Sequence, residues 1–333
     1  MAAGAHSEFG LGIFPAHLSA LPSVPQRMER RLSGGGGARG THKMDFKRLA
    51  KAAILRGVCY SGAEWLRDCV RAAQNRLPAA ILTFHRVTDQ IPEDALTVST
   101  ARFRWMLRLL HEHYSVLSLT ELLDCLQKHQ LWPRRAVTIT FDDGYRDNFE
   151  FAAPILAEYG MPATFFVATG LMGTGRVMFW DEHLRGRVSW MEWGHVRELH
   201  RQGFEIGSHT VHHADLGRVS AAEAWVELTA SKAELEDKLG AQVSLFAYPF
   251  GQPGNITEEN RALVRKAGYR CCCSCHGGFV QLGDDPYRLQ RLPLNNWYAT
   301  PDELHFELRQ IAPQFWRRRM ERRKHHETHT PSG

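Results

Sequence analysis

Two neighbouring carboxylates stand at the end of a short apolar stretch. Residues 137–141 alternate apolar side chains with threonines, and Asp142, Asp143 and Gly144 follow directly. The alternation and the β-branched residues predict a buried strand. In parallel α/β folds the carboxyl ends of the strands form the edge at which chemistry is usually done. A turn without catalytic function is the alternative, because Asp and Gly are common turn residues.

A pair of histidines offers the partners that such carboxylates need. His209 and His213 are four residues apart and follow a stretch, 204–207, that is also expected to be a strand. Two neutral imidazoles and one carboxylate form a set that binds a divalent metal and leaves positions open for water or substrate. Asp143 is the expected third ligand. The alternative is a pairing by chance, because the chain has 18 histidines and some of them must stand four residues apart. His212 lies in the same segment but is not an expected ligand.

The elements that position these residues alternate along the chain. Strands are expected at 79–84, 115–118, 136–141, 163–167, 204–207, 244–248 and 269–274. Helices are expected at 101–113, from the cap Thr120 to Leu126, and at 147–159, 190–202, 220–239 and 257–267. Alternating strands and helices predict an α/β fold with a parallel sheet or barrel and right-handed crossovers.

The two ends of the chain differ from its middle in amino-acid composition and sequence pattern. Residues 1–43 are rich in Gly, Ala, Ser and Pro and are predicted to be disordered, as is the basic tail, 313–333. Residues 44–78 have the pattern of an amphipathic helical segment, which either meets a membrane surface or a partner or packs on the domain. Residues 79–312 form the expected folded domain.

Composition narrows the classes of partner and compartment. The net charge is +5, and the basic run at 316–324 is expected to be a solvated tail, so no nucleic-acid partner is predicted. Neither a signal peptide nor a run of eighteen apolar residues is found, which favours the cytoplasm. The amphipathic segment and the basic tail make peripheral contact with the inner membrane a hypothesis.

The cysteines do not predict a disulfide scaffold. There are seven, an odd number, and Cys271, Cys272, Cys273 and Cys275 are crowded together. Neighbouring residues on a strand point to opposite faces, so these four cannot form an ordinary set of structural bridges. They are expected to be small buried residues of a strand that follows Gly268 and Tyr269. A zinc knot is the alternative, although no second pair stands at finger spacing.

Four segments resemble one family in order and spacing. They are LTFHRV (82–87), TFDDG (140–144), SHTVHHADL (208–216) and FAYPFG (246–251). They are similar to the motifs of the polysaccharide deacetylases, the NodB-homology group of carbohydrate esterase family 4. The resemblance covers residues from about 79 to 300. It implies a distorted (β/α) barrel of about seven strands and metal-dependent removal of N-acetyl groups from amino sugars.

The resemblance also implies roles for individual residues. Asp143, His209 and His213 match the metal ligands, and Asp142 matches the general base. The backbone N–H of Phe250 matches the donor to the oxyanion; the family usually has Tyr there, but a backbone donor survives the change. Arg288 or Arg291 could pair with Asp142 and keep it ionised, as the family's arginine does, and Arg291 is the expected partner. Zinc is the expected metal, with cobalt or nickel as alternatives.

The general acid has no clear match. The family's Leu-x-His motif is missing, because the segment in about its place, 287–294, contains no histidine. His305 lies in an expected helix and is not predicted to serve as the acid. His85 or the protonated Asp142 is the alternative. His85, Tyr248 and Trp297 are the expected substrate contacts, and Trp180, Trp190 and Trp193 are further aromatic residues of the same region.

Three functions follow from these observations. The first is a deacetylase that acts on a polysaccharide or on its lipid-linked precursor. The second is a metal amidohydrolase of another C–N bond, in a formylated sugar or a cyclic ureide. The third is a glycan-binding module that has lost catalysis, which the missing acid histidine would allow.

Overall fold

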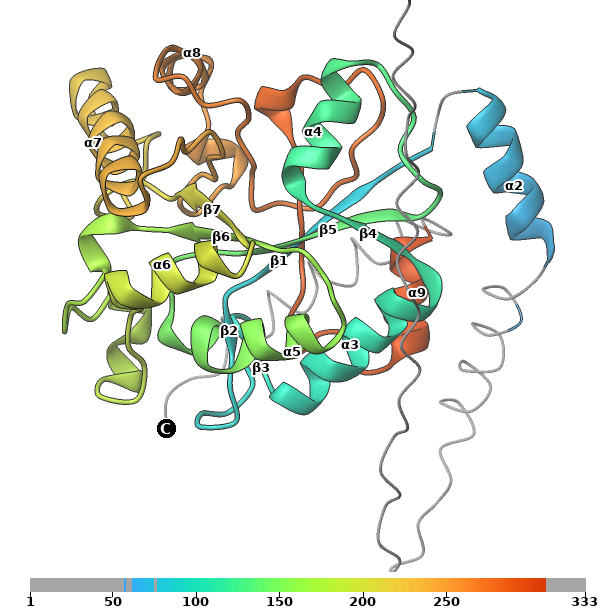
Figure 1. Ribbon diagram of the computed structural model, residues 1–333, viewed down its shortest axis with the longest axis horizontal. Helices are drawn as coiled ribbons and strands as arrows, with labels where there is room; N and C mark the ends of the chain where they lie inside the picture. Colours follow the sequence, from blue (N-terminus) through green and yellow to red (C-terminus); the bar gives the residue numbers. More distant parts are fainter. Residues whose placement is uncertain (1–56, 58–61, 75–76, 310–333) are drawn as a thin grey trace, which may run out of the picture. The chain divides into compact units, whose positions relative to one another are not determined.

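A computed structural model of the protein describes residues 57, 62–74 and 77–309 (Figure 1). The predicted disordered segments 1–43 and 313–333 lie outside these residues, as does most of 44–61, and the predictions made for them remain predictions.

Parallel strands form the centre of the domain. All five residues of β1 (Ala80–Phe84) pair in register with residues 137–141 of β5 (Ala136–Phe141), and both strands are buried throughout. β6 (Thr164–Val167) pairs with the end of β5, and β7 (Glu205–Ser208) pairs with β6. Burial on both faces explains why these strands are rich in β-branched and aromatic residues.

Short bridges close this sheet into a ring. Beyond β7, single parallel bridges join Ser208 to Phe246, Ala247 to Cys273 and Cys273 to Leu289. β8 (Leu292–Pro293) then pairs with β1, the strand at which the ring began. Within the described residues the expected distorted barrel is therefore confirmed, with the predicted strands 244–248 and 269–274 reduced to single bridges. We call the part of the ring that these bridges hold, from residue 246 to residue 289, the seam.

Three short strands lie outside the ring. β4 (Ser115–Leu117) pairs with the beginning of β5, on the edge whose end β6 occupies. β2 (Arg86–Val87) and β3 (Thr97–Val98) form a separate two-stranded sheet directly after β1.

Helices cover the outside of the sheet (Figure 1). They are α3 (Thr100–His113), α4 (Leu119–Gln127), α5 (Ala153–Glu158), α6 (Trp193–Arg201), α7 (Ala221–Leu239), α8 (Glu258–Lys266) and α9 (Pro301–Leu308). In the view of Figure 1, α4 lies above the strands, α3 and α5 lie below them, and α7 and α8 lie together at the upper left. Most of the predicted helices are thus confirmed within one to three residues at their ends.

Two helix starts differ from the sequence prediction. Ser118, rather than Thr120, caps α4: its hydroxyl accepts from the N–H of Glu121, whose carboxylate accepts from the N–H of Ser118 in return. The predicted helix 147–159 begins as a π-helical turn, Asn148–Ala152, and becomes α-helical only at α5, which has a proline in its first turn. Proline has no N–H to donate into the preceding turn, so the regular ladder is interrupted there.

One end of the ring is packed with aromatic rings. Phe84 and Phe165 stack on either side of Phe141, with centroids 5.4 and 4.8 Å away, and Phe103 of α3 meets Phe84 edge-on. Phe84 and Phe141 are the last residues of β1 and β5, so this layer fixes the strand ends from which the site residues follow.

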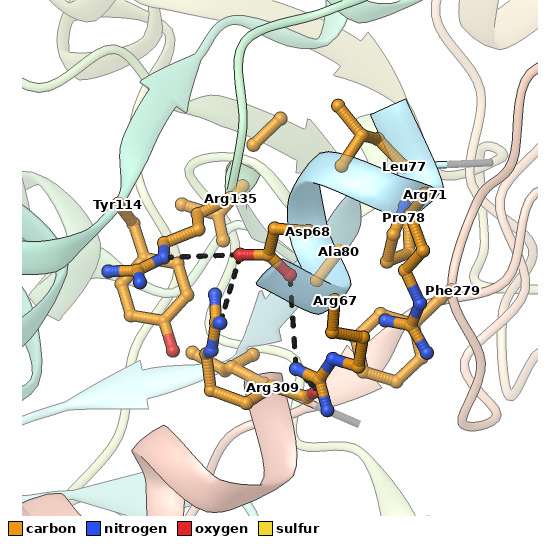
Figure 2. A pocket seen from close by; sticks show the side chains of 13 residues that line it. Arg67, Asp68, Arg71, Leu77, Pro78, Ala80, Tyr114, Arg135, Phe279 and Arg309 are labelled. Atoms are coloured by element: carbon orange, nitrogen blue, oxygen red, sulfur yellow. Dashed lines mark hydrogen bonds and ion pairs between the residues drawn. The ribbon is translucent and has the colours of Figure 1, made fainter. Parts of the chain in front are cut away.

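Helix α2 (Gly62–Ala73) is held against the domain through one buried carboxylate. Asp68 is paired with Arg309 at 2.9 Å and with Arg134 and Arg135 at 3.7 Å (Figure 2 labels Asp68, Arg135 and Arg309). For the face of α2 that carries Asp68, the structure therefore agrees with the prediction of a helix packed on the domain. No described helix is long and apolar enough to cross a membrane.

Candidate metal centre and active site

Asp143, His209 and His213 meet at the carboxyl ends of two strands. Asp143 follows β5, and both histidines lie in the loop after β7. Oδ1 of Asp143 is 3.3 Å from Nε2 of His209 and 3.2 Å from Nε2 of His213. All three side chains are buried, and their ligand atoms lie within 4.8 Å of one another. The structure thus brings together the three residues that the sequence singled out.

The backbone is strained where it presents these side chains. Asp143 and His213 have φ values of 72° and 56°, in the left-handed region that residues other than glycine rarely enter. Gly144 follows with φ 89°, and a Cβ there would come within 2.6 Å of the Met172 side chain. Such conformations cost on the order of 1–3 kcal/mol each and persist at functional sites where the surroundings enforce them.

The donor set fits a divalent cation. Nδ1 of His209 lies 2.8 Å from the carbonyl oxygen of Ala247, to which only a protonated Nδ1 can donate, so Nε2 is left with a lone pair directed at Asp143. Nδ1 of His213 is buried without a hydrogen-bond partner among the described residues. Burial works to raise the pKa of Asp143, but the two imidazoles hold that pKa well below its ordinary value. A cation between Oδ1 of Asp143 and the Nε2 atoms of His209 and His213 would compensate the buried carboxylate and use both imidazole lone pairs.

Glu227 of α7 holds the loop that carries the histidines. One of its carboxylate oxygens accepts from the N–H groups of Val211 and His212, each at 2.9 Å, and the other lies 2.7 Å from Nδ1 of His212. His212, which lies between the two ligands, thus points away from the metal centre and fixes their loop. Glu227 does not stand out in the sequence, because it lies in a helix far from the motif.

We expect Glu227→Ala to weaken zinc affinity by about 10- to 100-fold, as the loss of groups that orient ligands commonly does. Glu227→Gln keeps one acceptor oxygen and should lose less. Competition with a chromophoric chelator measures the affinity. Glu234→Gln, two turns further along α7, is the matched control. Equal affinities in Glu227→Ala and the control would contradict the assigned role.

Asp142 forms a buried ion pair with Arg291. Nη1 and Nη2 of Arg291 donate to Oδ1 and Oδ2 of Asp142 at 2.8 and 2.6 Å, and both side chains are essentially inaccessible. Nη1 also donates to the hydroxyl of Thr140, and Nε donates to the carbonyl of Ser274. Burial works to raise the pKa of Asp142, but the charge of Arg291 outweighs it, and the pKa is lowered. The pairing expected from the sequence is present.

The two acids and the histidines open into one cavity of about 760 Å³. His85, at the end of β1, lines it beside Asp142, and so do Phe250 and Trp297. Phe250 has φ 59°, and its ring lies 4.8 Å from that of His213. No hydrogen-bond acceptor among the described residues takes up the N–H of Phe250. A group bound in the cavity can therefore use this N–H.

Aromatic side chains form one wall of the cavity. Trp180 lies with its ring 4.7 Å from that of His213, and its Nε1 donates to the hydroxyl of Tyr145 at 2.9 Å. That hydroxyl donates to Asp181, which is paired with buried Arg86. Phe179, which is 73% exposed, extends this wall to the surface and was not singled out from the sequence.

Some predicted residues lie elsewhere. Tyr248 is 1% exposed and packs with Phe246 in a separate part of the core, so its prediction as a substrate contact is wrong. Residues two apart on an extended segment face the same side, and here that side is the outer one. Trp190 is buried against Tyr145, and His305 is buried beside Tyr114. Neither lines the cavity.

The chain is similar in sequence to known proteins. A family model described as "Polysaccharide deacetylase" matches residues 129–272. The poly-beta-1,6-N-acetyl-D-glucosamine N-deacetylase of Staphylococcus aureus is 27% identical over 210 residues, which are 60% of this chain and 68% of the relative.

Solved structures agree on the fold. The deacetylase PplD of Streptococcus pyogenes superposes with a TM-score of 0.60 at 24% identity, over 69% of this chain and 97% of PplD. IcaB of Ammonifex degensii gives 0.59 at 21%, over 70% and 97%. The segment that matches the family model, 129–272, contains Asp142 and the three candidate metal ligands Asp143, His209 and His213, so this part of the chain resembles a polysaccharide deacetylase.

Proposed function

We propose that this protein is a metal-dependent hydrolase that removes N-acetyl groups from the amino sugars of a polysaccharide. One observation carries the proposal: an ionised carboxylate, Asp142, stands beside the ligand set of Asp143, His209 and His213 at the base of an aromatic cavity. A cation held there supplies Lewis-acid chemistry, because it lowers the pKa of bound water and polarises a carbonyl.

The chain's own residues supply the remaining steps. Asp142 accepts the proton of the water that attacks the acetyl carbon, and Arg291 keeps that carboxylate ionised until then. The N–H of Phe250 donates to the oxyanion of the tetrahedral intermediate. A single such donor is worth on the order of a hundred- to a thousandfold in rate. When the C–N bond breaks, the departing amine takes up a proton and acetate leaves.

The proton for the amine comes from the Asp142 side of the cavity. Burial lowers the pKa of His85, which favours the neutral imidazole that can take a proton over from Asp142. Ligand atoms of His85 and Asp142 lie within 4.8 Å of each other, which supports a relay of that proton through His85. This pair takes the part that a histidine from the missing Leu-x-His motif would play.

The polymer and the metal belong to the same proposal. The Staphylococcus aureus relative is named for poly-beta-1,6-N-acetyl-D-glucosamine, and an exopolysaccharide of this type, or its lipid-linked precursor, is the substrate that we propose. Sugar rings stack on flat apolar faces, which Phe179, Trp180 and Trp297 offer along the cavity. Zinc suits two imidazoles and a carboxylate, and cobalt or nickel is the alternative.

Acetate release tests the function directly. We expect the zinc-loaded protein to release acetate from N-acetylglucosamine oligomers, with β-1,6-linked ones turned over faster than β-1,4-linked ones. A strong chelator should abolish release, and zinc or cobalt should restore it. Metal content is measured alongside. Hydrolysis of a formylated sugar or cyclic ureide instead would favour another amidohydrolase, and saccharide binding without turnover would favour a glycan-binding module.

Peripheral contact with the cytoplasmic side of an anionic membrane is a separate part of the proposal. On α2, Leu66 and Val70 are 60% and 47% exposed, one helical turn apart, and Arg67 and Arg71 adjoin them. Such a face suits an anionic bilayer surface. We expect the protein to float with vesicles that contain anionic lipid, and Leu66→Asp/Val70→Asp to reduce this strongly. Val226→Asp, at a 59% exposed position on α7, is the control. Equal flotation of both variants would refute the contact.

A further inference from the structure

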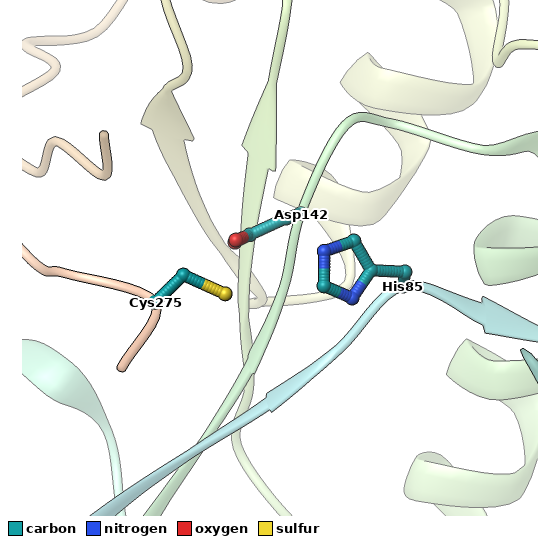
Figure 3. Close-up of side chains that lie close together, drawn as sticks. All are labelled: His85, Asp142 and Cys275. Atoms are coloured by element: carbon teal, nitrogen blue, oxygen red, sulfur yellow. The ribbon is translucent and has the colours of Figure 1, made fainter. Parts of the chain in front are cut away.

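A second cluster of metal-binding groups lies in the same cavity. His85, Asp142 and Cys275 each offer one ligand atom, and these atoms lie within 4.8 Å of one another (Figure 3). The three residues come from separate parts of the chain: the end of β1, the end of β5 and the seam. None of them belongs to the set of Asp143, His209 and His213.

The backbone around the cluster holds its members in place. The N–H of Cys275 donates to the carbonyl of Gly251 at 2.9 Å, and a Cβ on Gly251 would come within 2.3 Å of that nitrogen. The carbonyl of His85 accepts from the side-chain amide of Asn148 at 2.6 Å. Asp142 is fixed by Arg291. The close approach that only a glycine permits therefore brings the Cys275 thiol to the cavity.

The ligand atoms of this cluster are of the types that a thiophilic divalent cation prefers. Thiolate, imidazole and carboxylate together are typical zinc ligands. Ligand atoms around a tetrahedral zinc ion lie about 3.3–3.8 Å apart, so small side-chain rotations complete the coordination. Each oxygen of Asp142 accepts one N–H from Arg291. Each keeps a further lone pair, because a carboxylate has about four acceptor sites.

We infer that His85, Asp142 and Cys275 form a second, weaker binding site for zinc or another thiophilic cation, and that its occupation inhibits turnover. A cation there takes up the oxygen lone pair with which Asp142 accepts a proton and the nitrogen with which His85 relays it. The binding itself goes beyond the proposed function, whereas the inhibition rests on it. The hard cations Mg²⁺ and Ca²⁺ should not compete, because they prefer oxygen ligands.

Cadmium titration of the protein loaded with one equivalent of zinc tests the binding. We expect a second equivalent to bind and to produce the ultraviolet absorption of a cadmium–thiolate bond. In Cys275→Ser this absorption should be lost and the second affinity should fall by about tenfold or more. Cys125→Ser, which removes a half-buried cysteine remote from the cavity, should behave like the unchanged protein.

Zinc titration of acetate release tests the inhibition, with each variant compared with its own rate at one equivalent. Half-inhibition of Cys275→Ser should need about tenfold more free zinc than that of Cys125→Ser. Binding of one equivalent only, or a second equivalent held equally well by Cys275→Ser, would overturn the site. Binding through Cys275 without loss of turnover would overturn the inhibition. If no acetate is released at all, the cadmium experiment still decides the site.

Discussion

Asp142→Asn should lower kcat for acetate release by about a thousandfold, within the range that general base catalysis contributes. The amide keeps the shape of the carboxylate but accepts no proton from water. Because Asp143, His209 and His213 are unchanged, the variant should still bind one equivalent of zinc. Parallel measurements of kcat and metal content therefore separate loss of the base from loss of the metal.

Asp147→Asn is the matched control for this change. Asp147 is another poorly accessible acid five residues further along the chain, but it does not line the cavity. Burial raises its pKa to about 7, so a neutral amide replaces a group that is already partly protonated at neutral pH. We expect its kcat to change by less than about tenfold. If Asp142→Asn kept more than a tenth of the activity, Asp142 would not be the general base.

Arg291→Met should affect both stability and pH dependence. Breaking a fully buried ion pair on one side commonly costs about 3–5 kcal/mol, because the remaining charge is left without compensation. With the guanidinium gone, the largest influence that opposes burial is lost, and the pKa of Asp142 rises. Asp142 acts as a base only when ionised, and its lowered pKa keeps it ionised well into the acidic range. The acidic limb of the rate profile should therefore move to higher pH in the variant.

Denaturant unfolding and the pH profile of kcat/KM measure these two effects. Arg288→Met is the control, because Arg288 is half exposed and pairs with Glu258 at the surface, where ion pairs contribute about 0–1 kcal/mol. The double variant Asp142→Asn/Arg291→Gln should regain part of the stability and none of the activity. An unchanged acidic limb in Arg291→Met would show that Arg291 does not set the ionisation of Asp142.

The candidate metal site could be predicted from the sequence because strand ends determine it. Asp143 and the two histidines follow strands that are recognisable from their residues, and parallel strands bring their carboxyl ends to one rim. Arg291 was predicted from the family resemblance, and it does pair with Asp142. These residues are positioned by regular, local structure, which a sequence pattern can reveal.

The remaining site residues depend on irregular structure. Tyr248 was misplaced because single bridges in the ring determine which face of its segment points to the cavity. A sequence pattern does not reveal such bridges. Cys275 was expected to be buried with its three neighbours, yet the crossing at Gly251 brings it to the cavity. Glu227 and Phe179 act through tertiary contacts with loops outside their own elements, at residues 211–212 and 250.

The seam gives the pair of Asp142 and Arg291 a second importance. Asp142 follows the continuously laddered strand β5, whereas Arg291 lies just beyond the seam, between the single bridge at Leu289 and the two-residue strand β8. The ion pair therefore also links the regular part of the barrel to its least regular part. Loss of either residue alone would leave the other as an uncompensated buried charge. A related protein without catalytic activity would therefore have to keep both residues or replace both with apolar ones. Persistence of this pair in a relative is thus no proof that the relative is still an enzyme.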